Sequence, residues 1–282
     1  MNKFDGKSIY DEVKDFCDGF AAVKRNGKWG FVNDQGEEVV PCKYDRADNN
    51  FINGFAKVKL NGKEGYVNEQ GEEIVPCKYD DTWSFVEGLA WVELDGKYGY
   101  VNEQGKEVVP CKYDRANNFV NGFASVELNE KWGFVNKKGE EVVPCKYDCS
   151  WPFSEGFAGV RLDGKWGFVN KQGEEVIPFK YDNVGLRSFS EGFAAVELDG
   201  KWGFINGQGE EVIPCRYDYA WIFSEGFAAV QLDGKWGFVN KQGKVVIPFK
   251  YDGDATFSDG FAKVQLNGKR LKVNTRGEEF WD

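Results

Sequence analysis

The sequence predicts an all-β fold built from eight copies of one repeat of about 34 residues. Three observations predict this class. A Gly stands before Phe-Ala or Leu-Ala eight times, at intervals of 34 to 36 residues. Apolar and polar residues alternate between Gly-containing turns, which is typical of strands, and no segment shows helical periodicity. The eight glycines are Gly19, Gly54, Gly88, Gly122, Gly156, Gly192, Gly226 and Gly260.

The clearest copy begins with a predicted strand at residues 193–198, in which every second residue is apolar and faces the same side. The Asp-Gly pair at 199–200 is the strongest signal for a two-residue hairpin turn. Residues 201–206 then form the second predicted strand. Trp202 and Phe204 lie on one face of it, and the Gly between them leaves room on the other face.

The third predicted strand, residues 210–214, follows an Asn-x-x-Gly turn. We expect Pro214 to end it, because Pro cannot donate to a central ladder. The segment at 216–218, usually Lys-Tyr-Asp, is a candidate for a short fourth strand. Only the loop from this Asp to the next Gly varies, spanning 8 residues in most copies, 9 after Asp45 and 10 after Asp182. Repeat proteins collect such insertions on one face, often the binding face.

Two architectures can use this repeat, and the sequence leaves both open. The preferred one is a β-propeller-like ring of eight four-stranded blades, and the alternative is a linear β-solenoid. In either case residues 1–282 form a single repeat domain. The N-terminal segment 1–18 is expected to complete the last repeat, because Ser8-Ile9-Tyr10-Asp11 matches the segment that would follow Asp282.

The motif Lys-Trp-Gly-Phe-Val-Asn-x-x-Gly-Glu-Glu-Val-Val/Ile-Pro-x-Lys-Tyr-Asp resembles the bacterial WG (KWG) repeat family. It departs from the family pattern at Glu64-Gly65 and Tyr98-Gly99, and the last copy has Arg270-Leu271, which is typical of an end unit. The resemblance implies a β-rich repeat array that binds partners or ligands. The motif is nearly intact at residues 28–45, 131–148, 165–182, 201–218 and 235–252.

Composition excludes several classes of function. A net charge of −10 argues against binding to nucleic acid and to anionic membrane surfaces. The sequence has no His, which removes Ser-His-Asp and Cys-His catalysis, and it has no Cys-x-x-Cys pair for zinc. The Glu-Glu pairs lie on solvated strands, where neighbours face opposite sides. We therefore expect no enzyme activity, no metal and no cofactor.

Cysteine usage and the N-terminus predict a soluble, cytoplasmic protein. Five of the seven Cys follow the repeat's Pro, and Phe179 and Phe249 take that position in two other copies. An exchange between Cys and Phe indicates a small buried hydrophobe in a reducing compartment, not a disulfide. Residues 1–7 contain no apolar stretch of the kind found in secretory leaders.

The Trp of each Trp-Gly pair is expected to pack between repeats, because nearly every copy has it. Three other Trp residues stand three positions after the Tyr-Asp pair, in the variable loop, and are predicted to contact a partner. Arg46 and Arg115 occupy the corresponding loops, and Trp91 lies at a strand position that varies in type and so is expected to be exposed. The three loop residues are Trp83, Trp151 and Trp221.

These features predict a non-enzymatic scaffold that presents variable loops to a protein partner. A lectin-like protein that stacks carbohydrate on its loop Trp residues is the alternative. Similar loops in every copy would favour the lectin, because each site would then bind the same sugar. The loops around Trp83, Trp151 and Trp221 differ in sequence, which favours one asymmetric surface for a protein.

Overall fold

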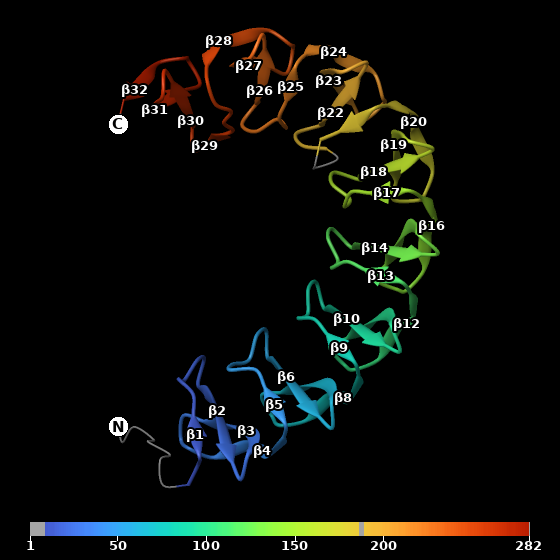
Figure 1. Ribbon diagram of the computed structural model, residues 1–282, viewed down its shortest axis with the longest axis vertical. Helices are drawn as coiled ribbons and strands as arrows, with labels where there is room; N and C mark the ends of the chain where they lie inside the picture. The colour runs from blue at the N-terminus through green and yellow to red at the C-terminus, as the bar shows by residue number, and fades with distance from the viewer. Residues whose placement is uncertain (1–8, 186–188, 282) are drawn as a thin grey trace. The chain divides into compact units, whose positions relative to one another are not determined.

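The structure is a computed structural model that describes residues 9–185 and 189–281. These residues contain eight separate four-stranded antiparallel sheets, and their strands are labelled in Figure 1. In every sheet the strands follow chain order, so each repeat is a simple meander. The prediction of an all-β chain of eight repeats is confirmed. No helix of membrane-spanning length and apolarity occurs among the described residues.

The strands have nearly constant lengths from repeat to repeat. The first four sheets contain β1 (Glu12–Val13), β2 (Phe20–Arg25), β3 (Lys28–Asn33), β4 (Glu38–Tyr44), β5 (Arg46–Ala47), β6 (Phe55–Leu60), β7 (Lys63–Asn68), β8 (Glu73–Tyr79), β9 (Asp81–Thr82), β10 (Leu89–Leu94), β11 (Lys97–Asn102), β12 (Glu107–Tyr113), β13 (Arg115–Ala116), β14 (Phe123–Leu128), β15 (Lys131–Asn136) and β16 (Glu141–Tyr147). The last four contain β17 (Cys149–Ser150), β18 (Phe157–Leu162), β19 (Lys165–Asn170), β20 (Glu175–Tyr181), β21 (Asn183–Val184), β22 (Phe193–Leu198), β23 (Lys201–Asn206), β24 (Glu211–Tyr217), β25 (Tyr219–Ala220), β26 (Phe227–Leu232), β27 (Lys235–Asn240), β28 (Val245–Tyr251), β29 (Phe257–Ser258), β30 (Phe261–Leu266), β31 (Lys269–Asn274) and β32 (Glu279–Trp281).

The repeat's Pro does not end its strand, so that prediction is wrong. Strand β24 continues through Pro214 to Tyr217, because its register against β23 shifts between two pairs. Phe204 pairs with Ile213, but Trp202 pairs with Tyr217, so the residues between them bulge out of the ladder. At a bulge the missing N–H of Pro removes no ladder hydrogen bond.

The expected fourth strand also lies elsewhere. The Lys-Tyr-Asp segment is the end of the long strand, and the additional strand is the two-residue segment that follows its Asp. Strand β25 is an example, and it pairs with β26 of the next repeat. Seven of the eight sheets therefore begin just after a Tyr-Asp pair, and the last begins at Phe257, five residues after Asp252. Of the segment 1–18, residues 1–8 lie outside the described residues, and Glu12–Val13 pairs with β2.

The bulge explains why Gly follows Trp in the motif. A Cβ placed on Gly203 would lie 2.4 Å from the carbonyl oxygen of Ile213, closer than any real Cβ contact. The last repeat supports this explanation, because it has Leu271 at the Gly position. In this repeat Leu271 pairs with Trp281, and β31 pairs with β32 without a register shift.

The chain divides into two compact units, residues 1–129 with 135–140 (unit 1) and residues 130–134 with 141–282 (unit 2). In unit 1, Phe31 and Val40 of one sheet pack on Phe51 and Val58 of the next repeat. Neighbouring sheets thus meet face to face, as the blades of a propeller do, and the strands of one sheet do not join those of the next.

In unit 2 the same packing buries the motif Trp residues. Trp202 and Phe204 lie in one cluster with Phe223 and Val230 of the following repeat. Trp166, Trp202 and Trp236 are all at most 9% exposed, which confirms for these three that the motif Trp packs between repeats, whereas Trp29 and Trp132 are half-buried.

The row of motif Cys residues is half-buried, and the described cysteines are free thiols. Burial, followed by the charge of a nearby Glu, raises the pKa of Cys77, Cys111 and Cys215 to about 11. A thiol with a pKa this high is mostly protonated at neutral pH and therefore a weak nucleophile.

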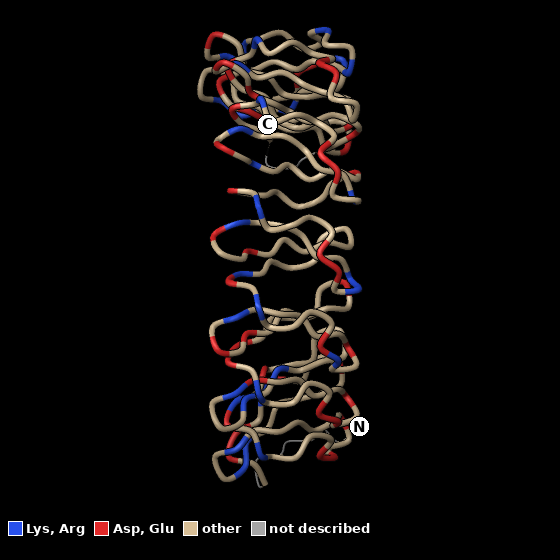
Figure 2. The backbone as a smooth tube through the Cα atoms, turned by 90° about the vertical axis from the view of Figure 1, so that its right-hand side faces the viewer, with Lys and Arg blue, Asp and Glu red and all other residues tan. Residues whose placement is uncertain are grey.

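Charged side chains that recur in the repeats connect each repeat to the next. Figure 2 shows Lys, Arg, Asp and Glu recurring from repeat to repeat. Asp80, which follows β8, accepts a hydrogen bond from the Lys63 ammonium at 2.5 Å. Its other oxygen accepts the backbone N–H of Asp95 at 2.8 Å, in the hairpin turn of the following repeat. The Lys and Asp of the motif therefore support turn geometry.

A second two-residue turn precedes each Phe-Ala strand, and its first residue has positive φ even where it is Glu. The carboxylate of Glu87, in one such turn, accepts the N–H groups of Asn121 (2.8 Å) and Gly122 (3.0 Å) in the next turn along the chain. We call Glu87, Glu155, Glu191 and Glu225 the turn-capping glutamates, because each accepts a hydrogen bond from the following repeat's turn.

We expect acid to destabilise the protein through these contacts. Burial raises the pKa of Glu191, but hydrogen bonds from Lys241 and from the N–H groups of Gly226 and Glu225 outweigh it and hold the pKa below its usual value. A carboxyl whose pKa is lowered by folding stabilises the protein above the unfolded pKa, and this is lost as pH falls through the folded pKa. Melting temperature should stay level down to about pH 5 and then fall.

Thermal melts across this range check the expectation, with Glu191→Gln as the matched variant. The variant should be less stable than wild type at neutral pH, and the difference should shrink in acid. A difference that stays constant with pH would show that Glu191 is not held ionised by its contacts.

Each repeat has a two-residue hairpin turn between its Phe-Ala strand and its Trp-Gly strand, and among the described residues the turn at 129–130 is the one that lacks Gly. A substitution in this turn should therefore increase the stability of the protein. Asn129 and Glu130 both have positive φ, 52° and 62°, as the type I′ turn requires. Glu in this conformation is strained, so Glu130→Gly should raise the free energy of unfolding by about 0.5–1 kcal/mol. Glu103→Gly, where φ is not positive, should not stabilise. A lower stability for Glu130→Gly would contradict the turn assignment.

Candidate functional site

The three Trp residues predicted to lie in variable loops directly continue the two-residue strands. The backbone N–H groups of Trp83, Trp151 and Trp221 donate to the carbonyl oxygens of Trp91 (3.1 Å), Gly159 (2.8 Å) and Ala229 (2.9 Å). The rings are therefore presented from the edge of a sheet, not from mobile loop tips. Each ring thus has a fixed backbone position at the start of its variable segment.

In unit 2, two of these residues line one pocket. It has a volume of about 290 Å³ and lies at the ends of β17, β21 and β25, the first strands of three successive sheets. Trp151 and Trp221 form part of its wall, together with Trp202 and Tyr219. The remaining described lining residues are Asn183, Val184, Gly185, Ala220 and Ile222, and none of them is charged.

The aromatic rings of this pocket support one another. The Trp151 ring stacks on Trp166 at 6.0 Å between centroids and 8° between planes. Tyr219 contacts Trp202 at 5.1 Å, Trp221 at 5.6 Å and Trp236 at 5.9 Å. Three of these rings belong to the motif and are buried, whereas Tyr219 is 37% exposed. The pocket thus has a rigid aromatic floor and one accessible aromatic wall.

Two polar atoms of the pocket residues have no partner. The indole nitrogens of Trp151 and Trp221 are buried and make no hydrogen bond. An unpartnered buried N–H costs about 1–3 kcal/mol, and indole can only donate.

In unit 1 the corresponding residues form a surface cluster. Trp83 is 52% exposed and stacks on Trp91 with 5.8 Å between centroids and 10° between planes. Trp91 also contacts Tyr98 at 5.4 Å. Trp91 was expected to be exposed, but it is half-buried, because the Trp83 ring covers it across the strand pair.

The two Arg residues of the predicted site lie apart from the aromatic groups. Arg46 lines a hollow of about 190 Å³ with Asp48, Lys57 and Glu64. Here Glu64 replaces the motif Trp, and its carboxylate lies 3.3 Å from the Lys57 ammonium. Arg115 is exposed and forms an ion pair with Glu127 at 3.4 Å. We therefore leave both Arg residues out of the aromatic pocket.

Sequence reasoning missed three residues of the pocket. Tyr219 is the first residue after a Tyr-Asp pair, the same position that Arg46 and Arg115 occupy, and that correspondence was a usable signal. Asn183 has the same position one repeat earlier. Trp202 was assigned to the core, where it does pack, yet one part of its ring also reaches the pocket.

The chemistry of the pocket is that of non-covalent binding. It offers ring faces and the polar groups of Tyr219 and Asn183. Among the described residues, no cluster of three or more Cys, Asp or Glu side chains is suited to hold a metal ion.

Comparisons with known proteins agree with the repeat pattern. The family model described as WG containing repeat matches eight consecutive stretches, from residues 7–29 to residues 236–269. No curated protein matches the chain. Among solved structures it is similar to Hsv2 of Kluyveromyces lactis, with 10% identity, a TM-score of 0.41, and 67% of this chain and 70% of that chain covered. It is also similar to a eukaryotic initiation factor, with 13% identity, a TM-score of 0.44, and 90% and 81% covered.

Proposed function

The chain belongs to the WG containing repeat family, and from this premise we propose that it is a non-enzymatic protein-interaction scaffold of the cytoplasm. Its rigid sheets position aromatic residues beside the first strand of successive repeats. A protein partner docks on these residues. The net charge of −10 and the absence of His support a role that involves neither nucleic acid, nor anionic membranes, nor His-dependent catalysis.

The unit 2 pocket is the observation that carries the proposal. Trp, Tyr and Arg dominate the binding energy of protein interfaces, and they do so where a pocket excludes water. Among its described lining residues, the pocket has two Trp rings beyond the buried motif Trp, one accessible Tyr and no charged side chain. Such a site accepts an apolar side chain of a partner.

A lectin-like function is the second candidate, and the stacked, exposed Trp83 favours it, because sugar rings pack on aromatic faces. The pocket favours a protein. A sugar presents many hydroxyl groups and needs several polar side chains around it, whereas Asn183 and Tyr219 are the pocket's polar side chains. Trp83 also lies in unit 1, where its partners Trp91 and Tyr98 provide no charged group.

Affinity capture from the native host tests the proposal with two variants that spare the core. Tyr219→Ser removes the accessible wall of the unit 2 pocket, and Trp83→Ser removes the exposed ring of unit 1. We expect a protein recovered by wild type to be lost with Tyr219→Ser, because truncating a hot-spot residue costs about 2 kcal/mol or more. Ile52→Ser, at a residue 47% exposed and outside both sites, is the control.

Each outcome has one interpretation. Loss with Tyr219→Ser alone places the contact at the pocket, and loss with Trp83→Ser alone moves it to unit 1. Equal recovery by all variants contradicts an aromatic contact face. Binding of wild type to a glycan array, abolished by either substitution, would replace the scaffold by the lectin.

A further inference from the structure

One face of the last sheet differs from the same face of every other repeat. In β22 and β23 this face carries Ala195, Trp202 and Phe204, and the following repeat covers it. In β30 and β31 the corresponding positions hold Lys263, Arg270 and Lys272, and all three residues are exposed. The chain has thus exchanged three packing residues for three cations at this one face.

Asp254 and Asp259 line the same two hollows as these cations, but no ion pair joins them to the cations among the described residues. Within the described part of the chain, Lys263, Arg270 and Lys272 form no ion pair, whereas the hairpin Lys of earlier repeats each bind an Asp, as Lys201 binds Asp218 at 2.7 Å. Lys263 and Lys272 are also direct partners across the strand pair. Like charges placed opposite one another destabilise a sheet. Uncharged or mixed polar residues would make this face polar without this repulsion.

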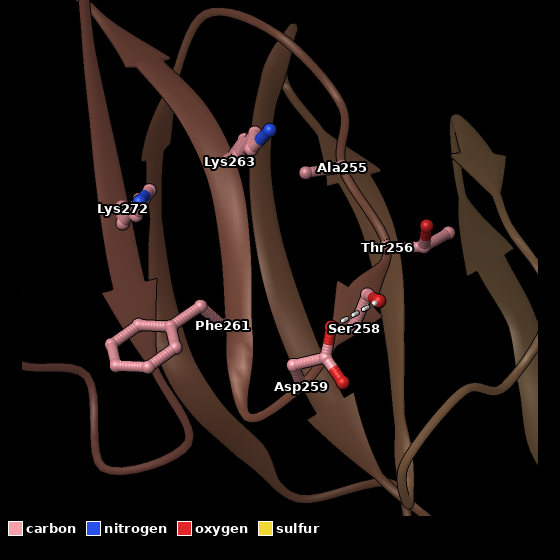
Figure 3. A pocket seen from close by; sticks show the side chains of 7 residues that line it. All are labelled: Ala255, Thr256, Ser258, Asp259, Phe261, Lys263 and Lys272. Carbon is pink, nitrogen blue, oxygen red and sulfur yellow. Dashed lines mark hydrogen bonds between the residues drawn. The ribbon is translucent and has the colours of Figure 1, made fainter.

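The face is hollowed beside the cations. Two hollows, of about 510 and 550 Å³, share Lys263 and Lys272 in their walls. Figure 3 shows the first of them, with the two Lys side chains along one side, Thr256 and Ser258 along the other, and Phe261 at one end. Asp259 lies toward the Phe261 end, where it accepts a hydrogen bond from the Ser258 hydroxyl at 3.5 Å.

Apolar rings border the cations on the same face. Phe261 is 40% exposed and contacts the ring of Phe280, which is 46% exposed, at 5.7 Å. Phe280 is the cross-strand partner of Lys272, so it projects on the same side. Along β30 the apolar position Phe261 precedes the cation Lys263 by two residues, a distance of about 7 Å in a strand.

We propose that this face, defined by Phe261, Lys263, Arg270, Lys272 and Phe280, docks an extended acidic segment of a partner protein. Charge complementarity selects the partner, because three unpaired cations stand on a chain whose net charge is −10. An extended segment repeats every second side chain on one side at the same spacing as β30. The segment therefore has an acidic residue two positions from an aromatic or aliphatic one. This surface is separate from the aromatic pocket and does not depend on it.

Nucleic acid fits the same face less well. A polyanion would meet three or four cations here and the excess of acidic residues elsewhere on the chain. The planes of the Phe261 and Phe280 rings are 81° apart, so the two rings form one apolar ridge. They do not form two parallel surfaces on which successive bases could stack. A peptide side chain packs on such a ridge.

Fluorescence anisotropy with the full chain tests the proposal. The probe is a labelled peptide that alternates Glu with Ser and has one Phe two positions from a Glu. The matched peptide has Gln in place of every Glu. We expect the Glu peptide to bind wild type with an affinity that falls as salt rises, and the Gln peptide to bind at least about tenfold more weakly.

Two double variants provide the structural control. Lys263→Glu with Lys272→Glu should abolish binding of the Glu peptide. Lys171→Glu with Lys244→Glu changes the net charge equally, at exposed residues away from this face, and should leave binding unchanged. Phe261→Ser should weaken binding without changing charge. Melting curves confirm that all variants fold.

Three results would overturn the proposal. The Glu peptide does not bind wild type, or both double variants lose binding equally, or a single-stranded oligonucleotide binds the face more tightly than the peptide. The first two results remove the acidic partner, and the third replaces it by nucleic acid.

Discussion

Replacing Phe204 with Ala is expected to lower the free energy of unfolding by about 4 kcal/mol. Phe204 is fully buried between two neighbouring sheets of unit 2, and its ring meets Phe223 of the next repeat at 4.8 Å in an edge contact. The substitution leaves a cavity at a junction between repeats, where the rigid ladders on both sides prevent collapse. Denaturant titration followed by Trp fluorescence measures the loss.

The last repeat supplies the matched control for this prediction. Lys272 has the same position as Phe204, but it is exposed, so Lys272→Ala should change stability by less than about 0.5 kcal/mol. If Phe204→Ala and Lys272→Ala had similar effects, the face-to-face packing of repeats would not be the main source of stability in unit 2.

Replacing Gly203 with Ala should cost about 3 kcal/mol, although it adds only one methyl group. The new Cβ would lie 2.4 Å from the carbonyl oxygen of Ile213, which belongs to backbone and cannot rotate away. The bulge in β24 would have to shift, and with it the packing of Tyr217. The measurement is again the free energy of unfolding.

Gly253→Ala is the control, because it tests whether replacing any Gly of the chain lowers the free energy of unfolding. A Cβ at Gly253 would meet Gln265 at 3.7 Å, an ordinary contact, and φ there is not positive. We expect a near-neutral effect. Equal losses at Gly203 and Gly253 would mean that the bulge does not explain the Trp-Gly motif.

The local elements of the repeat could be predicted because short-range chemistry determines them. The Asp-Gly pair at 199–200 has positive φ at both residues, as its turn type requires, and Trp202 packs between repeats as expected. The error at Pro214 arose because the rule that Pro ends a central strand ignores bulges. The bulge was signalled by Gly203, whose missing side chain was assigned to free space and in fact admits a carbonyl group.

The second turn, before Phe-Ala, was missed for a different reason. Glu191-Gly192 does not look like a hairpin turn, since Glu disfavours positive φ. Its conformation is supported from outside the repeat, because Glu155 accepts the N–H groups of both turn residues at 2.7 Å. Information of this kind lies in the neighbouring repeat, and a strictly local rule cannot use it.

The candidate site was only partly predictable on the same grounds. Residue type and position identified Trp151 and Trp221, but the pocket is made by three successive repeats. Which loop residues converge depends on how sheets stack. Pairing within one sheet decides that Trp91 lies beneath Trp83 and that Arg46 faces a separate charged hollow.

The turn-capping glutamates have a consequence for synthesis on the ribosome. Each of these carboxylates precedes the turn it caps by about one repeat, so it has already emerged when the turn's N–H groups appear. A nascent repeat therefore meets a partly built neighbour that is ready to hold its next hairpin. Growth from the N-terminus then adds repeats one at a time on a finished template, and the four repeats that have a turn-capping glutamate expose the carboxylate that the following repeat's turn binds.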